Sequence, residues 1–213
     1  MKVKICGITN WDEAKLCIDA GVDALGFLVG ITHLAEDQVT RDEALEIIKK
    51  VPPFISTVAV THLTDAAEVI DICRYLGVTT VQIHNVMTPE NVKLVRMEMP
   101  SVKIIKTFHV DEQLSIETIK PFVNLVDAVL FDTKTEDRLG GTGITHDWNI
   151  TSRISKEIGL PIILSGGLNS DNVASAIQKI PPLFAVDVNS GVETKGKKDF
   201  ERVKKFTHIA KMS

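Results

Sequence analysis

The feature that most limits the fold of this chain is a regular alternation of apolar runs with helical patterns from one end to the other. Each run is short and almost wholly apolar, which is typical of a parallel strand buried on both faces. Each following segment carries apolar residues three and four apart, the spacing of a helix with one buried side. Eight such pairs fit into 213 residues. The strands are expected at residues 3–6, 24–28, 55–60, 81–84, 102–106, 128–131, 161–164 and 184–188.

Eight consecutive strand-and-helix units predict a (β/α)8 barrel, the TIM-barrel fold of the α/β class. An open doubly wound sheet normally has fewer units. The segments between the units are short, so we expect a single domain over residues 1–213. Active sites of such barrels lie at the C-terminal ends of the strands. Polar residues directly after the apolar runs are therefore the candidates for a functional site.

The charge balance argues against a nucleic-acid partner. The formal net charge is −4 and the isoelectric point is about 5.9, whereas a phosphate backbone needs clustered cations. One basic cluster lies at residues 195–205, but Asp199 and Glu201 interrupt it, so we interpret it as the solvated face of a last helix. With 44% hydrophobic and 24% charged residues, the chain can bury a full core.

The lengths of the apolar runs and the spacing of the cysteines indicate where in the cell the protein lies. The first residues lack the apolar run of a signal peptide, and no stretch approaches a membrane span, so we expect a cytoplasmic protein with no membrane partner. Cys6, Cys17 and Cys73 are widely spaced and form no CxxC pair, which argues against a disulfide framework and a structural zinc site. No histidine pair has ligand spacing, so we expect no metal.

Two glycine turns follow the last two strands and suggest a phosphate site. Gly166 and Gly167 follow the seventh strand, and Ser190 and Gly191 follow the eighth. Glycines let backbone N–H groups approach an anion closely, and this place in barrels recurs as a phosphate site. The alternative is that the glycines only make tight turns. Two such turns on adjacent strands favour a phosphorylated small molecule as the ligand.

Cys6 and Asp132 end the first and sixth strands, which lie across the mouth of an eight-stranded barrel from each other. Such a pair can act as base and acid on opposite sides of one substrate. A thiol is a competent base only if its pKa falls toward neutrality, and a carboxyl can donate only if burial raises its pKa. Alternatively, Cys6 is a small buried hydrophobe and Asp132 caps the loop that follows it.

The loop at residues 133–147 is long and contains Gly141 within a glycine-rich run. We expect it to close over the site and exclude water, because loops of this length are often functional. The alternative is an ordinary solvated connection.

Several motifs occur in one order along nearly the whole chain. The most specific reads Lys-Ile-Cys-Gly-Ile-Thr at residues 4–9. The others lie at residues 25–27, 81–84, 131–133, 140–143, 147–148, 164–169, 172–173 and 186–193. In these motifs the chain resembles the phosphoribosylanthranilate isomerase family.

The resemblance implies a step of tryptophan biosynthesis, the Amadori rearrangement of N-(5-phosphoribosyl)anthranilate to 1-(2-carboxyphenylamino)-1-deoxyribulose 5-phosphate. By the same analogy Asp132 is the general acid that opens the ribose ring, and Cys6 is the general base that removes the C2 proton. The nitrogen of the substrate takes up the electrons, so no metal or organic cofactor is implied. The remaining site residues implied are Gln82, Gly141 and Asp187 at the substrate, and Gly166, Gly167, Ser190 and Gly191 at the phosphate.

The chain departs from the family where the carboxylate of the anthranilate ring is expected to bind. The family usually has an arginine in the loop after the second strand, but residues 28–40 hold none and offer Glu36 and Asp37 instead. His109 stands where an arginine usually follows the fifth strand. Lys106 or Arg138 could take over this role, or the ring could be held less tightly.

Two other functions stay open on the sequence. The first is a paralogous aldose–ketose isomerase that acts on another phosphoribosyl amine, which the altered loop favours. The second is a non-catalytic barrel that binds a phosphorylated metabolite, against which the retention of Cys6 and Asp132 counts. The sequence allows a monomer or a homodimer, since no outer helix shows a decisive apolar stripe.

Overall fold

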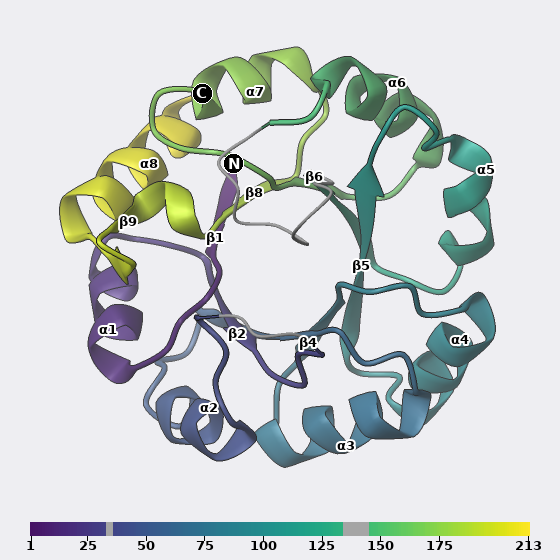
Figure 1. Ribbon diagram of the computed structural model, residues 1–213, viewed down its shortest axis with the longest axis horizontal. Coiled ribbons are helices and arrows are strands. Elements are labelled where there is room, and N and C mark those ends of the chain that lie inside the picture. The colour runs from purple at the N-terminus through teal and green to yellow at the C-terminus, as the bar shows by residue number, and fades with distance from the viewer. Residues whose placement is uncertain (33–35, 134–144) are drawn as a thin grey trace.

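The computed structural model describes residues 1–32, 36–133 and 145–213. Eight parallel strands close into a barrel in which each strand pairs with the next along the chain and β8 pairs with β1 (Figure 1). The predicted (β/α)8 fold is confirmed. The strands are β1 (Lys2–Ile5), β2 (Ala24–Leu28), β3 (Ser56–Thr61), β4 (Thr80–Ile83), β5 (Lys103–Val110), β6 (Ala128–Thr133), β7 (Ile162–Leu164) and β8 (Ala185–Val188).

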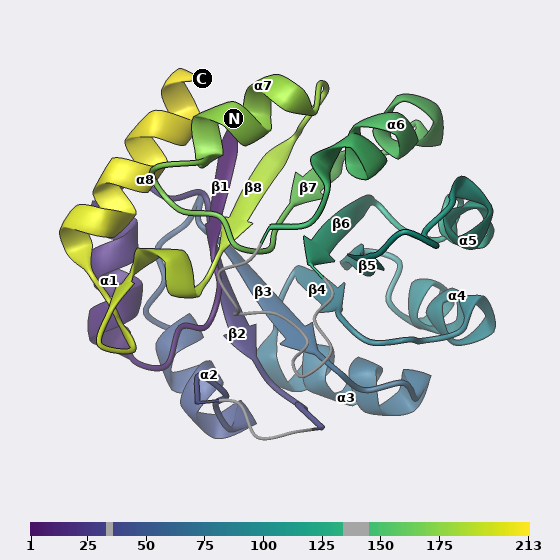
Figure 2. The ribbon, with the colours of Figure 1, turned by 45° about the horizontal axis from the view of Figure 1, so that its top comes forward.

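The helices form an outer ring around the strands, and Figure 2 shows the barrel turned by 45° from the view of Figure 1. They are α1 (Trp11–Asp19), α2 (Arg41–Ile48), α3 (Ala66–Leu76), α4 (Pro89–Glu98), α5 (Ile116–Ile119), α6 (Trp148–Ile158), α7 (Val173–Lys179) and α8 (Phe200–Met212). Short elements complete the chain: η1 (Lys120–Phe122), η2 (Ser190–Val192) and the hairpin of β9 (Glu193–Thr194) and β10 (Lys197–Lys198).

Local sequence signals start the helices. At α2, Thr40 and Glu43 form a capping box in which each side chain accepts the backbone N–H of the other residue. At α3, the side chain of Asp65 accepts two backbone N–H groups of the first turn. Pro89 occupies the first turn of α4, where its missing N–H is not needed.

Strand β5 is the element that differs most from the sequence prediction. It was expected over residues 102–106 but runs on to Val110, so that His109 pairs in register with Asp132 on β6. The helix after it, α5, begins at Ile116, because Asp111 first accepts the backbone N–H of Gln113 and makes a turn. The extension of β5 brings His109 to the mouth of the barrel.

The core has two layers separated by the barrel wall. The larger layer lies between strands and helices, and the smaller one fills the barrel with side chains such as Val58, Val60, Ile105 and Leu130. Since side chains alternate along a strand, the inward position of Ile105 sends Thr107 and His109 inward as well. No helix among the described residues has both the length and the apolar character that crossing a bilayer requires.

Candidate active site

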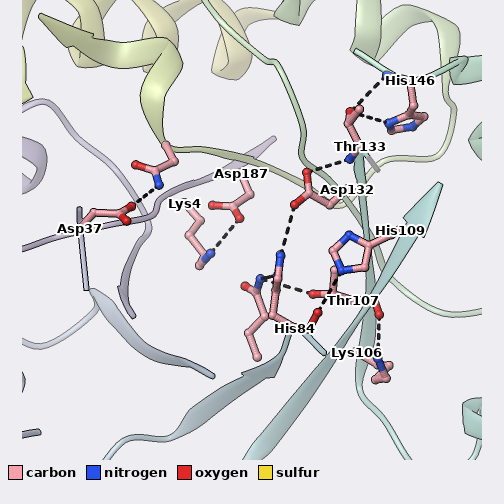
Figure 3. Close-up of polar contacts among 12 residues, drawn as sticks. Lys4, Asp37, His84, Lys106, Thr107, His109, Asp132, Thr133, His146 and Asp187 are labelled. Atoms are coloured by element: carbon pink, nitrogen blue, oxygen red, sulfur yellow. Dashed lines mark hydrogen bonds and ion pairs between the residues drawn. The ribbon is translucent and has the colours of Figure 1, made fainter. Parts of the chain in front are cut away.

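The mouth of the barrel, at the C-terminal ends of the strands, holds a group of buried polar side chains (Figure 3). Burying polar groups costs free energy unless they are paired, so such a group above an apolar interior marks the candidate site. Its members, each with less than a tenth of its surface exposed, are Lys4, Gln82, His84, Thr107, Asp132 and Asp187.

Lys4 on β1 and Asp187 on β8 form a buried ion pair, with 2.8 Å between Nζ and Oδ2. The two residues stand at paired positions of neighbouring strands. Burial lowers the pKa of Lys4, but the charges of Asp187 and Cys6 outweigh it, and the net pKa is raised. Among the described residues, the second oxygen of Asp187 has no hydrogen-bond partner. One carboxylate oxygen is therefore left for a ligand.

Cys6 lies at the end of β1 with 8% of its surface exposed. Burial raises the pKa of its thiol to about 11; Lys4 opposes this rise, while Asp187 adds to it. The expectation of a thiol pKa near neutrality is therefore wrong for the protein without substrate, because desolvation of the thiolate outweighs the nearby ammonium.

A carboxylate from the altered loop adds to this effect. Asp37 accepts a hydrogen bond from the side-chain N–H of Asn189, which follows β8, and its charge also raises the pKa of Cys6. Gly7 leaves the room for this contact, since a Cβ on it would lie 2.4 Å from Asp37 Oδ2. The loop that lacks the arginine of the family thus places an anion beside the candidate base.

Asp132 ends β6 and has 4% of its surface exposed. Its Oδ1 accepts the backbone N–H of Thr133 at 2.8 Å. Burial raises the pKa of the carboxyl to about 7, and the charge of Asp187 adds to the rise, while the Thr133 N–H and Lys4 oppose it. The expected rise of this pKa is present, and near neutrality a large share of Asp132 carries a proton.

His84 follows β4 and faces the second carboxyl oxygen of Asp132. The distance between Nε2 of His84 and Oδ2 of Asp132 is 3.4 Å. Its Nδ1 lies 3.1 Å from Nε2 of Gln82. Burial, then His109 and His62, hold the pKa of His84 well below its usual range, so the imidazole is neutral near pH 7. Gln82 therefore contacts the histidine, and it also reaches Thr107.

Three imidazoles from neighbouring strands line this side of the mouth. The rings of His62 and His84 are stacked with centroids 5.2 Å apart, and those of His84 and His109 meet edge to face at 5.0 Å. Ligand atoms of His84, His109 and Asp132 lie within 4.8 Å of one another, a spacing that would suit a metal ion. Burial raises the pKa of Asp132, the only acid of the three, to about 7, and the charge of Lys4 acts on the same carboxyl, so we interpret the group as a proton-handling cluster.

The glycine turns lie beside the acid. Gly166 has φ +87°, and a Cβ on it would lie 2.2 Å from Thr133 Oγ1 and 2.8 Å from Asp132 Oδ1. Gly167 has φ +66°, and its carbonyl accepts a hydrogen bond from Asn172. Such conformations favour glycine and leave the turn open to a ligand.

The second turn is equally tight. A Cβ on Gly191, in η2 after Ser190, would lie 1.9 Å from the carbonyl oxygen of Leu168. The structure therefore brings the two predicted phosphate turns into contact with each other at the ends of β7 and β8.

Lys106 does not face the mouth. Because it alternates with Ile105 and Thr107, its side chain points to the helix layer, where Nζ donates to the carbonyls of Asn85 and Thr107 at 2.8 and 2.7 Å. The ammonium lies over the rings of Phe108 and Phe122, and burial lowers its pKa to about 8. The suggestion that Lys106 binds a substrate carboxylate is therefore wrong.

Arg41 is the first cation that follows the altered loop in the sequence. Arg41 lies on the outside, where it pairs with Asp71 at 3.1 Å and stacks over Tyr75. Gly141 and Arg138 lie outside the described residues, so the expected closing loop stays a prediction.

The sequence interpretation missed Lys4 and Thr107 as members of the site, although both stand at inward positions of their strands. A polar residue two positions before or after an accepted site residue on the same strand was the available signal, because side chains repeat every second residue.

Comparisons with known proteins agree with this geometry. A family model described as N-(5'phosphoribosyl)anthranilate (PRA) isomerase matches residues 3–208. The chain is 40% identical to N-(5'-phosphoribosyl)anthranilate isomerase 2 of Methanosarcina mazei, over 99% of this chain and 94% of that protein.

Solved structures give the same result. The phosphoribosyl anthranilate isomerase from Thermotoga maritima superposes with a TM-score of 0.86 at 34% identity, covering 100% of both chains. A second isomerase structure, in complex with reduced 1-(o-carboxyphenylamino)-1-deoxyribulose 5-phosphate, has a TM-score of 0.83 at 32% identity, again over 100% of both chains.

Proposed function

The chain belongs to the N-(5'-phosphoribosyl)anthranilate isomerase family, and from this premise we propose how its residues divide the work of the reaction. The chain is an aldose–ketose isomerase of tryptophan biosynthesis that performs the Amadori rearrangement of N-(5'-phosphoribosyl)anthranilate. The observation that carries the assignment of residues is the placement of two buried ionisable groups, Cys6 and Asp132, at the ends of β1 and β6.

Asp132 is the general acid of the first step. Its proton passes to the ring oxygen of the ribose, the bond between that oxygen and C1 breaks, and the lone pair of the nitrogen forms an iminium with C1. The pKa of about 7 suits this step, because the carboxyl is protonated often enough to donate and acidic enough to release its proton.

Cys6 is the base of the second step. It removes the proton from C2, the electrons of that bond form a double bond to C1, and the nitrogen regains its lone pair. The resulting enolamine tautomerises to the ketone. Since the resting pKa of the thiol is about 11, the thiolate needs a cation, and the iminium left by the first step supplies a positive charge close by. The acid step therefore prepares the base step.

The remaining groups bind and orient the substrate. Asp187 keeps one oxygen without a partner among the described residues, which suits a ribose hydroxyl, while Lys4 holds the other. The turns at Gly166, Gly167 and Gly191 are open to backbone contacts with the phosphate, and Ser190 lies in the same turn. A phosphate held there leaves the anthranilate ring to extend toward β2–β5.

The experiment is an assay of the purified chain on phosphoribosylanthranilate and on the same amine without the ring carboxylate. Turnover of the carboxylated substrate that depends on both Cys6 and Asp132 supports the proposal. Turnover of the second compound alone assigns another phosphoribosyl amine as substrate. The anionic side chain of Asp37 at the mouth favours such an amine, because it repels a ring carboxylate. Binding of the reduced product analogue without turnover identifies a non-catalytic barrel.

A cytoplasmic location and a monomeric or homodimeric state complete the proposal. Sedimentation of the purified chain tests the second of these, and fractionation of cells tests the first.

A further inference from the structure

We propose that Gln82 is a positioning residue for the general acid: its amide carbonyl fixes His84 as the Nδ1–H tautomer, so that Nε2 accepts the proton of Asp132. The inference rests on the proposed role of Asp132 as acid. It gives Gln82 a different place from the one implied by the family resemblance, which put it at the substrate. Gln82 is buried, with 1% of its surface exposed, and its amide contacts His84.

The argument begins with the position of the proton on Asp132. Oδ1 of Asp132 already accepts the backbone N–H of Thr133 at 2.8 Å, so this oxygen offers a lone pair and acts as the carbonyl oxygen of the acid form. The proton of the acid form is therefore on Oδ2. That oxygen faces Nε2 of His84 at 3.4 Å, the pair that Figure 3 joins by a dashed line.

The tautomer of His84 follows from this position. A neutral imidazole carries one proton, and two N–H or O–H groups pointed at each other repel. With the proton on Oδ2 of Asp132, Nε2 of His84 must be the bare nitrogen and Nδ1 must carry the hydrogen. The opposite tautomer would point an N–H at Oδ2 and would stabilise the carboxylate, which is the spent form of the acid.

An Nδ1–H needs an acceptor, and Gln82 has one. The amide of Gln82 lies with its nitrogen 3.1 Å from Nδ1 and 3.4 Å from Thr107 Oγ1, while its oxygen Oε1 is buried with no hydrogen-bond partner among the described residues. Amide nitrogen and oxygen can exchange places by a half turn about the last side-chain bond. After that turn Oε1 accepts from both Nδ1–H of His84 and the hydroxyl of Thr107, and the amide NH2 takes the buried place that Oε1 held before.

The charged and titratable groups around Asp132 are consistent with a held proton. Asp187 from β8 raises the pKa of Asp132, while Lys4 from β1 and the Thr133 N–H on β6 lower it. On the β5 side His109 pairs in register with Asp132, and its ring packs edge to face on His84. None of these groups distinguishes the two tautomers of His84, since Gln82 alone contacts Nδ1 in the hydrogen bonds described.

The decisive measurement is the tautomer of His84 in the whole protein, read from the ¹⁵N shifts of its ring by two-bond ¹H–¹⁵N correlation near pH 6. We expect the proton on Nδ1. A proton on Nε2 overturns the inference and leaves the proposed function intact, because that function is judged by turnover and by its loss in Asp132→Asn.

The second test is Gln82→Met, which keeps the length of the side chain and removes the acceptor. We expect His84 to shift toward the Nε2–H form, the pKa of Asp132 to fall by about one unit in a ¹³C titration of its carboxyl, and kcat to fall about tenfold. KM should stay within twofold, because Gln82 does not touch the substrate. A rise of KM with an unchanged tautomer would instead place Gln82 at the substrate and overturn the inference.

Thr107→Val is the matched control. This substitution removes the hydroxyl that contacts the amide of Gln82 and leaves the contact between Gln82 and His84 in place. The tautomer of His84 should stay Nδ1–H in this variant. An equal shift of the tautomer in the two variants means that packing alone is responsible and contradicts the role of Gln82. If Gln82→Met does not fold, the tautomer of the unchanged protein still decides.

Discussion

The two halves of the barrel mouth are built in different ways. At the ends of β7 and β8 the site is made of backbone, with glycines in left-handed conformations and turns packed against each other. At the ends of β4, β5 and β6 it is made of side chains, in which His84 contacts both Gln82 and Asp132. In the proposed mechanism the first half holds the phosphate and the second half handles a proton.

The two kinds of site respond differently to amino-acid substitution. A backbone site depends on conformations that only glycine adopts easily, so nearly every substitution there strains the chain. A side-chain site depends on distances and protonation, so an isosteric substitution can remove the chemistry and leave the shape. The predictions below use this contrast, from the largest expected effect to the smallest.

Asp132→Asn should cause the greatest loss, a fall in kcat of about 10³-fold or more, because the amide keeps the shape and cannot give a proton to the ring oxygen. Binding of the reduced product analogue, measured by calorimetry, should change little, since the backbone half is untouched. Lost binding with normal kcat would place Asp132 in the phosphate-binding half and remove the contrast.

Cys6→Ala should lower kcat by about 10²-fold, since the C2 proton then has no base. Cys17 and Cys73 are also buried, and replacing them should have little kinetic effect. In a protein that keeps Cys6 alone, the thiolate absorbance near 240 nm should rise with a pKa of about 11. A midpoint near neutrality would mean that Lys4, and not the substrate, activates the thiol.

Gly167→Val should mainly raise KM, by about tenfold, because a branched side chain is strained at φ +66° and blocks the approach to the phosphate. Inorganic phosphate should protect this variant less than the parent against heat. A fall in kcat with unchanged KM would show that the backbone half takes part in the chemistry.

The proton held by Asp132 should also be visible in stability. Its pKa is raised from the usual 3.8 to about 7 in the folded chain, so its favourable contribution is present below pH 4 and is lost as pH rises through 7. Asp132→Asn should therefore be more stable than the parent at pH 8, by at most roughly 4 kcal/mol, and the gain should vanish near pH 4. Urea titrations at the two pH values measure it; an equal difference at both would mean that the carboxyl is not held protonated.

Lys106→Met should have the smallest effect on the reaction. The ammonium faces the helix layer and holds two backbone carbonyls, so its loss should lower Tm and leave the preference for the carboxylated substrate unchanged. Loss of that preference would mean that Lys106 reaches the mouth. This would contradict the alternation of side chains along β5, which points Thr107 inward and Lys106 outward.

The places of the glycine turns and of Cys6 and Asp132 at the strand ends could be predicted from local sequence, because glycine pairs and strand ends are visible within a few residues. The rest depends on register. The sequence suggested Lys106 for the mouth, but the inward set on β5 is Ile105, Thr107 and His109. The pKa of Cys6 was misjudged because burial of the thiol, and then the charges of Asp187 and Asp37, raise it, and these depend on residues far away in the chain. Distances between strands, not spacing within them, set these properties.

The position of Gly166 constrains how descendants of this protein can diverge. A single methyl group on this residue would collide with Thr133 and approach the oxygen of Asp132 that Thr133 holds. In the proposed mechanism the phosphate turn and the proton donor therefore lie against each other, and a change in one affects the other. A lineage that adopts a new ring on the amine can vary the loop after β2. A lineage that loses the phosphate turn at Gly166 must also change the surroundings of Asp132.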